Sequence, residues 1–433
     1  MVTPQAQAAM QREHAQIFTT SLFYFIYNSP TMTKLQSSAN NIPIQPLSPD
    51  QLAVSHHVWY FSTCLVSSSL PAPYKSLDTN RLTLVHFAVQ SLDVLNSLDK
   101  TLDSETKHHV INWIYALFIT LTTRDEKGEV MTIAGFKGGT FMGPSFYSSY
   151  HHDNNEICNN SDDTFNHVHI AMTYTALCTL AALGDDLSRL VPHKQAILHS
   201  LRLMQQHDGS FTCATNGSGA EHDLRFLYCA CAISYMLQDW SGVNIPNAIE
   251  YIKSCRSYDG GIGLLPGQEG HGGSTFCAIA SLVLMGKLDQ VLVNEWWQQL
   301  IHWCVHHQTT AVGGMQGRPN KVDDTCYSYW IGGTLRLLQC DFLIHQPSLQ
   351  DFVLSCQTIM GGFGKVQGAH PDLLHSFYSL AWLSLSQQPR HEEELDDGSE
   401  EDSPTEAPLL QTLDCALGIC QKRTSVFRVF DES

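Results

Sequence analysis

Glycine-rich turns recur about every 50 residues along the second half of the chain, and this repeat restricts the fold more than any other feature. A fixed period of this length indicates supersecondary units that bury their apolar faces only by stacking on one another. The chain has 433 residues, and an earlier, less regular copy of the turn begins at Lys137. The regular copies are Asp208-Gly209-Ser210-Phe211, Asp259-Gly260-Gly261-Ile262-Gly263, Gly313-Gly314-Met315 and Gly361-Gly362-Phe363-Gly364.

Two kinds of helical segment alternate between these turns. Residues 170–183 and 276–285 are nearly all apolar or small, so we expect them to be buried on every side. Residues 248–254 and 294–307 mix charged or polar residues with apolar ones, which is typical of surface helices. The alternation predicts an all-α fold, an α–α barrel in which a ring of inner helices lies inside a ring of outer helices. Closing the ring leaves no repeat with an exposed apolar face.

Four polar residues occupy the same place within the repeat. Arg225, His271, Cys326 and His375 follow their turns by 12 to 17 residues, near the start of each predicted inner helix. In a ring these starts converge at one end, where helix N-termini favour an anionic ligand. Ordinary helix capping would explain one such residue, but four in register favour a shared site.

The repeat also indicates how the chain divides. Residues 1–52 are polar, without sustained periodicity, and are predicted to be a poorly ordered extension. Residues 53–433 are predicted to form one α–α barrel domain with inserted loops near 148–163 and 391–407. Residues 409–419 are predicted to pack back as a last short helix.

Charge and cysteine content exclude some classes of protein. The net charge of −18 argues against a nucleic-acid partner, and nine acidic residues lie between 392 and 406. The fourteen cysteines are scattered, and no signal peptide opens the chain, so free thiols in a cytoplasmic protein are expected. No segment approaches the roughly 20 apolar residues needed to span a membrane.

Asp324, Cys326 and His375 are candidate metal ligands. A carboxylate, a thiolate and an imidazole supply three ligands, and a catalytic zinc ion keeps its fourth position open. Such an ion would lower the pKa of a bound substrate thiol and make it nucleophilic at neutral pH. Taken singly, each residue could instead be a helix cap or a core side chain.

The loop just before this motif is cationic. Arg318 and Lys321 lie in Gly317-Arg318-Pro319-Asn320-Lys321, and Arg225, His271 and Tyr327 could join them around a diphosphate. The predicted inner helices also carry many aromatic residues. These suit either an ordinary core or a pocket for a long apolar molecule with a charged head, and they are Phe87, Tyr174, Phe226, Tyr228, Tyr327, Tyr329, Trp330, Phe377 and Tyr378.

Several ordered motifs between about residues 56 and 389 resemble a known family. The chain resembles the β subunits of protein prenyltransferases, most closely those of type I geranylgeranyltransferases. The motifs are Arg81-Leu82-Thr83, His169-Ile170-Ala171-Met172-Thr173-Tyr174-Thr175, Leu224-Arg225-Phe226-Leu227-Tyr228-Cys229, His271-Gly272-Gly273-Ser274-Thr275-Phe276-Cys277, the cationic loop and Asp324-Thr325-Cys326-Tyr327-Ser328.

The resemblance implies a transferase that works as a heterodimer with a prenyltransferase α subunit. It implies transfer of geranylgeranyl from geranylgeranyl diphosphate to the cysteine of a C-terminal CaaX motif, with X mostly Leu. The protein substrates would be Rho/Rac/Rap-like small GTPases. One Zn²⁺ per β subunit is expected, and Mg²⁺ is expected to be dispensable, because Lys365 stands where farnesyltransferases carry a magnesium-binding Asp.

The resemblance also assigns roles to individual residues. Asp324, Cys326 and His375 match the zinc ligands, and His271, Arg318, Lys321 and Tyr327 match the diphosphate contacts. Thr83, where farnesyltransferases carry Trp, leaves room for a longer lipid. The remaining lipid-lining positions are Phe87, Arg225, Tyr228 and Trp330, and the peptide pocket comprises His169, Met172, Thr175, Phe226 and Leu374.

Four other classes of protein fit the sequence less well than a type I geranylgeranyltransferase β subunit. Terpenoid cyclases share the two-ring architecture, but Lys321 and Cys326 replace parts of their acidic motif. Thr83 and Lys365 argue against a farnesyltransferase, and a pocket for a terminal Leu argues against a Rab-type enzyme. A non-catalytic scaffold has no need of the metal-ligand set.

Overall fold

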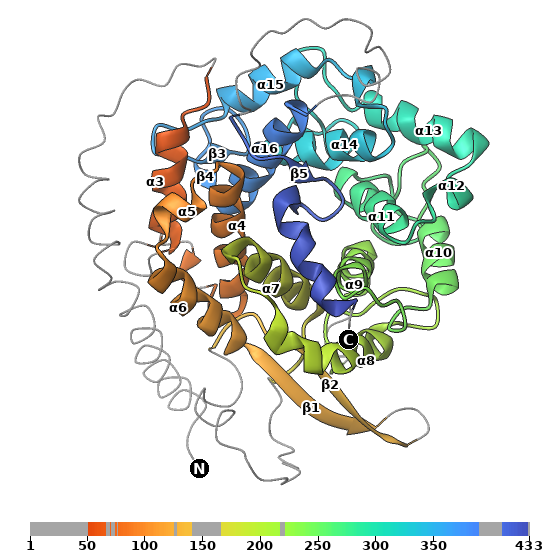
Figure 1. Cartoon of the computed structure of the whole chain (residues 1–433). Helices are drawn as coiled ribbons and strands as arrows, with labels where there is room; N and C mark the ends of the chain where they lie inside the picture. Colours follow the sequence, from red (N-terminus) through yellow and green to blue (C-terminus); the bar gives the residue numbers. More distant parts are fainter. Residues whose placement is uncertain are drawn as a thin grey trace, which may run out of the picture.

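Small apolar residues allow six helices to pack side by side in an inner ring. The computed structural model describes residues 51–65, 70, 74–75, 77–124, 128–140, 166–216, 221–388 and 409–431. Within these residues each inner helix contacts the next, and α16 returns to contact α4 (Figure 1). The inner helices are α4 (Arg81–Val94), α7 (Ile170–Leu183), α9 (Leu224–Met236), α11 (Gly272–Leu284), α14 (Thr325–Leu337) and α16 (Leu373–Ser386).

Amphipathic helices form the outer ring, so the predicted all-α toroid is observed. In α10, for example, Ala248, Tyr251 and Ile252 are buried, whereas Glu250 and Lys253 are exposed. Short helices α5 (Leu98–Thr101) and α12 (Leu288–Val291) and the 3-10 turns η3 (Asp78–Asn80), η4 (Ser188–His193) and η5 (Asp341–Leu343) connect the rings. The outer helices are α3 (Val54–Leu65), α6 (Ser104–Tyr115), α8 (Lys194–Met204), α10 (Ile245–Ser254), α13 (Asn294–Val305) and α15 (Gln346–Ser355).

The repeated glycine turns connect each unit of the toroid to the next. Gly209, Gly260, Gly313 and Gly361 all have φ between 77° and 95°, a backbone conformation that favours glycine. A Cβ atom at Gly209 would lie 2.0 Å from the carbonyl oxygen of Asn247 in α10, the next outer helix. Each turn therefore packs against the outer helix of the following unit, and the last turn packs against α3, which closes the ring.

The buried His57 of α3 stabilises the closure of the ring through two hydrogen bonds. The Gly362 N–H donates to His57 Nδ1 at 2.9 Å, and His57 Nε2 lies 2.9 Å from Gln357 Oε1. The imidazole also stacks on Phe363 at 4.6 Å. Burial lowers the pKa of His57 to about 4, which outweighs the hydrogen bond to Gln357. The closure thus depends on a neutral imidazole.

Acid is expected to weaken the closure. The stabilisation is complete above the ordinary histidine pKa of about 6.5 and is lost as the pH falls toward 4, because only the unfolded chain protonates readily. The full loss is about 3 kcal/mol. We expect His57→Gln to be less stable at pH 7.5, yet to lose less unfolding free energy than the parent between pH 6.5 and 4.5. Burial also lowers the pKa of His86 and His169, which both proteins retain, so their effects cancel. Equal pH dependence would contradict this role.

A long β-hairpin and the C-terminal segment differ from the sequence-based expectation. Strands β1 (Phe118–Arg124) and β2 (Val130–Phe136) pair in antiparallel fashion with Phe118 opposite Phe136, and the hairpin projects beyond the ring (Figure 1). β1 is rich in β-branched residues, which favour strands, and the base of the hairpin packs on α8. The helical periodicity around it did not reveal this insertion.

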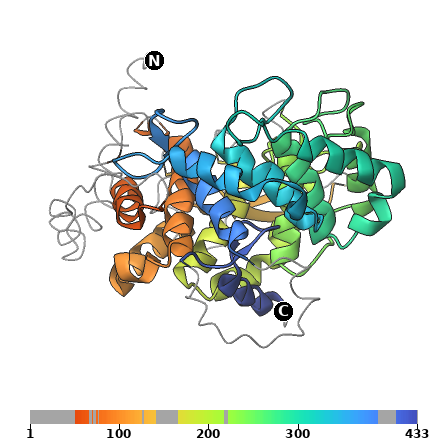
Figure 2. The same ribbon diagram turned by 90° about the horizontal axis from the view of Figure 1, so that it is seen from above.

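The prediction of a last helix over residues 409–419 is wrong. That segment contains β5 (Leu413–Asp414), and the following β6 (Ile419–Cys420) leads into a 3-10 helix, η6 (Gln421–Phe430). The hydroxyls of Tyr329, Tyr228 and Tyr174 donate to the carbonyl oxygens of residues 415, 416 and 417, and Gly418, with φ of 70°, lies in the turn that pairs β5 with β6. The segment is therefore a tight hairpin held by three inner helices. Figures 1 and 2 show this C-terminal segment (dark blue) across one end of the toroid.

Three predicted segments lie outside the described residues. They are nearly all of the extension 1–52 and the insertions near 148–163 and 391–407. Within the described part of the chain, no helix is both long and apolar enough to cross a membrane.

Candidate metal and anion site at the starts of the inner helices

The starts of the inner helices are joined to one another by a repeated hydrogen bond. The first N–H groups of α7, α9, α11 and α14 donate to the carbonyl oxygens of Cys213, Leu264, Gly317 and Lys365, each in the loop after the next glycine turn. Side chains cap four of the inner helices: Asp223 caps α9, His271 caps α11, Asp324 caps α14 and Asp372 caps α16. We call this end of the toroid the N-terminal rim, and it carries the four residues that the repeat places in phase.

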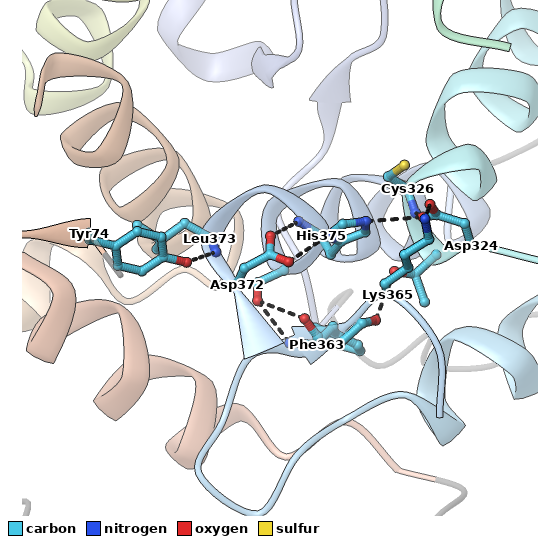
Figure 3. A network of polar contacts seen from close by, with 11 residues as sticks. Tyr74, Asp324, Cys326, Phe363, Lys365, Asp372, Leu373 and His375 are labelled. Carbon is cyan, nitrogen blue, oxygen red and sulfur yellow. Dashed lines mark hydrogen bonds and ion pairs between the residues drawn. The ribbon is translucent and has the colours of Figure 1, made fainter. Parts of the chain in front are cut away.

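The three candidate metal ligands lie close together on this rim. The ligand atoms of Asp324, Cys326 and His375 all lie within 4.8 Å of one another, and this is the one such group of three in the described residues. Asp324 is the N-cap of α14 and accepts the Cys326 N–H at 3.0 Å, so its cap role and its ligand role are compatible. His375 arrives from α16, and its Nε2 lies 3.2 Å from Asp324 Oδ1 (Figure 3).

A small hairpin holds the two helices in this arrangement. Strand β3 (Phe363–Gly364) pairs with β4 (Pro371–Asp372), which leads directly into α16. Thr325, the first residue of α14, donates its N–H to the Lys365 oxygen at 3.0 Å and its hydroxyl to the Gly364 oxygen at 3.0 Å. The loop that connects the strands therefore positions both ligand-bearing helices.

Asp372 is a positioning residue that the sequence did not reveal. Its Oδ1 accepts the His375 N–H at 2.9 Å, and its Oδ2 lies 2.6 Å from His375 Nδ1 (Figure 3). A carboxylate on one imidazole nitrogen directs the other nitrogen toward a metal and raises its basicity. The available signal was an Asp three residues before the histidine, a spacing that also marks ordinary helix caps.

His375 and Cys326 both hold protons that a bound metal ion would displace. Burial alone would lower the pKa of His375, but hydrogen bonds with Asp324 and Asp372 raise it to about 9. Burial, with Asp324 nearby, raises the pKa of the Cys326 thiol well above its usual range. Both groups therefore hold protons that metal binding would release. One carboxylate, one thiol and one imidazole are all zinc ligands, and three protein ligands match a catalytic site.

Removing the charge of Asp372 is expected to weaken metal binding. Asp372→Asn keeps an oxygen for the cap of α16 but loses the carboxylate that holds His375 Nδ1. Outer partners of this kind change metal affinity by roughly 10- to 100-fold. Zinc affinity measured by competition with a chelator should fall by that factor. The metal-free protein should also melt at a somewhat lower temperature, because it loses the pair between His375 and Asp372. Unaltered affinity would mean that Asp372 only caps the helix.

His271 and Tyr327 form a hydrogen-bonded pair with a defined direction. The N–H groups of Gly273 and Ser274 donate to His271 Nδ1 at 3.1 and 3.5 Å, so the neutral imidazole carries its proton on Nε2. Nε2 lies 2.9 Å from the Tyr327 oxygen and donates to it, which leaves the phenolic O–H free to donate to a ligand. Burial, then the charge of Arg318, lowers the pKa of His271 and keeps the ring neutral.

Gly317 allows Tyr327 to reach this position. A Cβ atom at residue 317 would lie 2.0 Å from the Tyr327 ring, so any larger residue would displace the phenol. The glycine of the cationic loop thus serves the geometry of the next helix, a role that the sequence motif does not show.

The predicted cations lie on the same rim, and most are paired with carboxylates. Arg318 Nη1 lies 2.6 Å from Glu269 Oε1, and both side chains are about half exposed. Arg225 instead forms hydrogen bonds of 3.0 and 2.7 Å with the buried Asp223. The two pairs differ in burial: the Arg318–Glu269 pair is open to solvent, whereas Asp223 is buried, caps α9 and holds Arg225 in place.

Two lysines complete the positive charge near the metal-ligand set. Lys321 is exposed in the cationic loop. Lys365 Nζ lies 3.4 Å from Asp324 Oδ2, and its side chain is 53% exposed. Lys365 therefore pairs with a candidate metal ligand in this structure, a pairing that the sequence did not predict.

Aromatic side chains form a closed circuit inside the ring. Contacts of 4.1 to 6.2 Å between ring centres link one residue to the next across all six inner helices. Several of the rings stay partly exposed although they face one another, so the centre of the toroid is not fully packed. The circuit is His86, Phe87, Tyr174, Tyr228, Phe276, Trp330 and Tyr378.

Most of the predicted peptide-pocket residues lie at the starts of neighbouring helices. The Thr83 hydroxyl lies 3.6 Å from Met172 Sδ, so the residue assigned to the lipid adjoins the peptide group. His169 packs edge-on against Phe226 at 6.4 Å. Thr175 is buried one turn further along α7, and Leu374 is 39% exposed beside His375.

The family resemblance suggested by the motifs is confirmed by comparison with known proteins. A model of the prenyltransferase alpha-alpha toroid domain matches residues 52–419. The β subunit of geranylgeranyl transferase type-1 from Arabidopsis thaliana is 39% identical over 353 residues, which cover 80% of this chain and 88% of that protein. Its namesake from Dictyostelium discoideum is 41% identical over 327 residues, which cover 74% and 88%.

Two further matches are more distant. The protein farnesyltransferase β subunit of Schizosaccharomyces pombe is 27% identical over 345 residues, 76% of each chain. The solved structure of Candida albicans protein geranylgeranyltransferase-I complexed with GGPP superposes with a TM-score of 0.69 at 23% identity, covering 88% of this chain and 99% of that one. The described residues form six inner and six outer helices, and with these matches the chain belongs to the prenyltransferase alpha-alpha toroid family.

Proposed function

We propose that this chain is the β subunit of a zinc-dependent protein geranylgeranyltransferase of type I. The observation that carries the proposal is the meeting of Asp324, Cys326 and His375 on the rim that also bears Arg318, Lys321 and Tyr327. The relatives of 39–41% identity, named as geranylgeranyl transferase type-1 β subunits, support it over most of their length. The reaction is transfer of geranylgeranyl from its diphosphate to a cysteine near the C-terminus of a protein.

The metal-ligand set would prepare the nucleophile. A zinc ion on Asp324, Cys326 and His375 would lower the pKa of a substrate thiol and hold it as thiolate. Asp372 keeps His375 Nε2 directed at that position. Release of Lys365 from Asp324 would then place an exposed ammonium beside the leaving group.

The cationic side of the rim would stabilise the departing diphosphate. Tyr327 would donate its O–H to a phosphate oxygen, because His271 occupies the phenol oxygen as a donor. Arg318 and Lys321 would supply positive charge where negative charge develops. Glu269 now holds Arg318, and the exposed pair contributes little stability, so a diphosphate can replace it at low cost. When the diphosphate leaves, Glu269 can pair with Arg318 again.

The partially exposed aromatic circuit would receive the lipid. Phe87, Tyr228 and Trp330 belong to it, and Thr83 lies at the start of α4 beside Met172. The mixed pocket of His169, Met172, Thr175 and Phe226 would hold the last residue of a CaaX sequence, with Leu374 nearby. Rho/Rac/Rap-like GTPases ending in Leu are the proposed protein substrates.

The partner and compartment follow from the same assignment. We propose a heterodimer with a prenyltransferase α subunit, as the names of the relatives as β subunits suggest. All thirteen cysteines in the described part of the chain are unpaired, which suits a reducing cytoplasm.

The proposal is tested by co-expression with a prenyltransferase α subunit. We expect transfer of geranylgeranyl, in preference to farnesyl, to peptides ending in Leu rather than Ser. A preference for farnesyl and Ser would make the chain a farnesyltransferase subunit, and absence of any transfer by a stable heterodimer would defeat the proposal.

Magnesium is expected to be unnecessary for this reaction. Lys365 would supply the positive charge near the diphosphate that a magnesium ion supplies elsewhere, so the rate should not change when Mg²⁺ is withheld. Lys365→Ala should make the rate respond to added Mg²⁺, and Lys253→Ala, on the outer ring, serves as the control. A parent enzyme that stops without Mg²⁺ would disprove this role of Lys365.

A further inference from the structure

Two exposed histidines on the outer ring lie face to face. His302 lies in the last turn of α13 and His306 is the C-cap of that helix, and their rings stack with centres 3.8 Å apart and planes 25° from parallel. Neither belongs to the N-terminal rim. His307, the next residue, is buried, lies against Trp303 and is turned away from the pair.

The hydrogen bonding of His306 leaves its outer nitrogen ready to bind a metal. His306 Nδ1 lies 2.8 Å from the His302 carbonyl oxygen, which can only accept. Nδ1 must therefore carry the proton, and Nε2 keeps its lone pair. A carbonyl on the far nitrogen is the usual partner of a metal-bound imidazole, because it fixes both the tautomer and the ring orientation.

The separation of the rings suits chelation. Two imidazole nitrogens bound to one ion at about 2.0–2.1 Å in tetrahedral geometry lie roughly 3.3 Å apart. The ring centres are already 3.8 Å apart, so side-chain rotation that turns the two ring edges toward one point can bring two nitrogens to that spacing. Histidines at i and i+4 on one helical face are the arrangement that supplies two zinc ligands in helical metal motifs.

We propose that His302 and His306 form an auxiliary site for a divalent transition-metal ion, with water completing its coordination. Imidazole favours Zn²⁺, Ni²⁺ and Cu²⁺ over Mg²⁺ or Ca²⁺, which prefer oxygen ligands. With two protein ligands the site is weaker and exchanges faster than the three-ligand set on the rim. The protein should therefore take up a second zinc ion when zinc is in excess.

The test uses the zinc-loaded heterodimer titrated with Ni²⁺ in a calorimeter. We expect one Ni²⁺ to bind beyond the catalytic ion, and His302→Asn and His306→Asn each to weaken this binding by about tenfold or more. His199→Asn is the matched control, because His199 also places Nδ1 3.0 Å from a backbone oxygen but stacks on no other described histidine. Transfer activity and melting temperature should be unchanged in all three variants.

Two outcomes would overturn the proposal. One is equal Ni²⁺ affinity in the parent and in both α13 variants, and the other is an equal loss in His199→Asn. Cys326→Ala separates the two metal sites, since the auxiliary Ni²⁺ should still bind when the rim set is broken.

Discussion

Cys326→Ala is expected to leave the protein without stoichiometric zinc and to lower the transfer rate by roughly a thousandfold, equivalent to about 4 kcal/mol of barrier. The thiol is the one sulfur ligand of the set, and its Sγ lies within 4.8 Å of the ligand atoms of Asp324 and His375. Without it, two ligands remain, and they already neutralise each other as an ion pair at 3.2 Å. The free energy of metal binding would then no longer exceed the cost of separating that pair.

Elemental analysis and single-turnover transfer measure the two effects. Cys356→Ala is the matched control, because this thiol is equally buried, belongs to a neighbouring turn and is not in the ligand set. It should lose some stability but keep both zinc and activity. A Cys326→Ala protein that retains one zinc per heterodimer would show that the ligands have been assigned incorrectly.

Thr83→Trp is expected to reverse the lipid preference. Thr83 is small, partly buried and 3.6 Å from Met172, so an indole at this place would project between α4 and α7. If the end of the longer lipid lies there, the indole excludes its fourth isoprene unit and leaves the shorter farnesyl chain accommodated. A steric conflict of about 2–3 kcal/mol would lower kcat/KM for geranylgeranyl diphosphate by roughly 30- to 150-fold.

Competition between the two lipid diphosphates gives the ratio directly. Thr83→Val, which keeps the volume and removes the hydroxyl, should leave the ratio near that of the parent. Because the indole also presses on Met172, the melting temperature must be measured to separate misfolding from selectivity. Unchanged kinetics with both lipids in a stably folded Thr83→Trp variant would place the lipid end elsewhere.

The repeat made most of the fold predictable, because helical periodicity and glycine turns are local properties. The turns at Gly209, Gly260, Gly313 and Gly361 need positive φ, and glycine reports that need directly. The hairpin at residues 118–136 was not predicted. The β-branched residues of β1 favour a strand, but they lie in a chain whose repeat is helical, and the packing of β2 on α8 is not visible in the sequence. The segment 409–419 was assigned wrongly because its partners lie far away in the sequence: β5 pairs with β6, and tyrosines of three inner helices donate to the carbonyl oxygens of residues 415 to 417.

The candidate site was also predictable only in part. Ligand types are visible in a sequence, so Asp324, Cys326 and His375 could be proposed from their chemistry and from their phase within the repeat. The partners of these residues could not. Glu269 and Asp372 would pass for ordinary surface charges in the sequence, yet Glu269 holds Arg318 and Asp372 orients His375. Lys365 was expected near the diphosphate, but its pairing with Asp324 was not.

The sequence by itself determined the toroid and the kinds of side chain gathered at the starts of its inner helices, because both follow from period and composition. Only the tertiary structure decided which atoms face one another: the closure of the ring at His57, the proton on His271 Nε2 and the pairing of His302 with His306. Hydrogen bonds and ring contacts are effective over a few ångströms. Their geometry is set by how separate segments pack, and the order of residues along the chain does not record it.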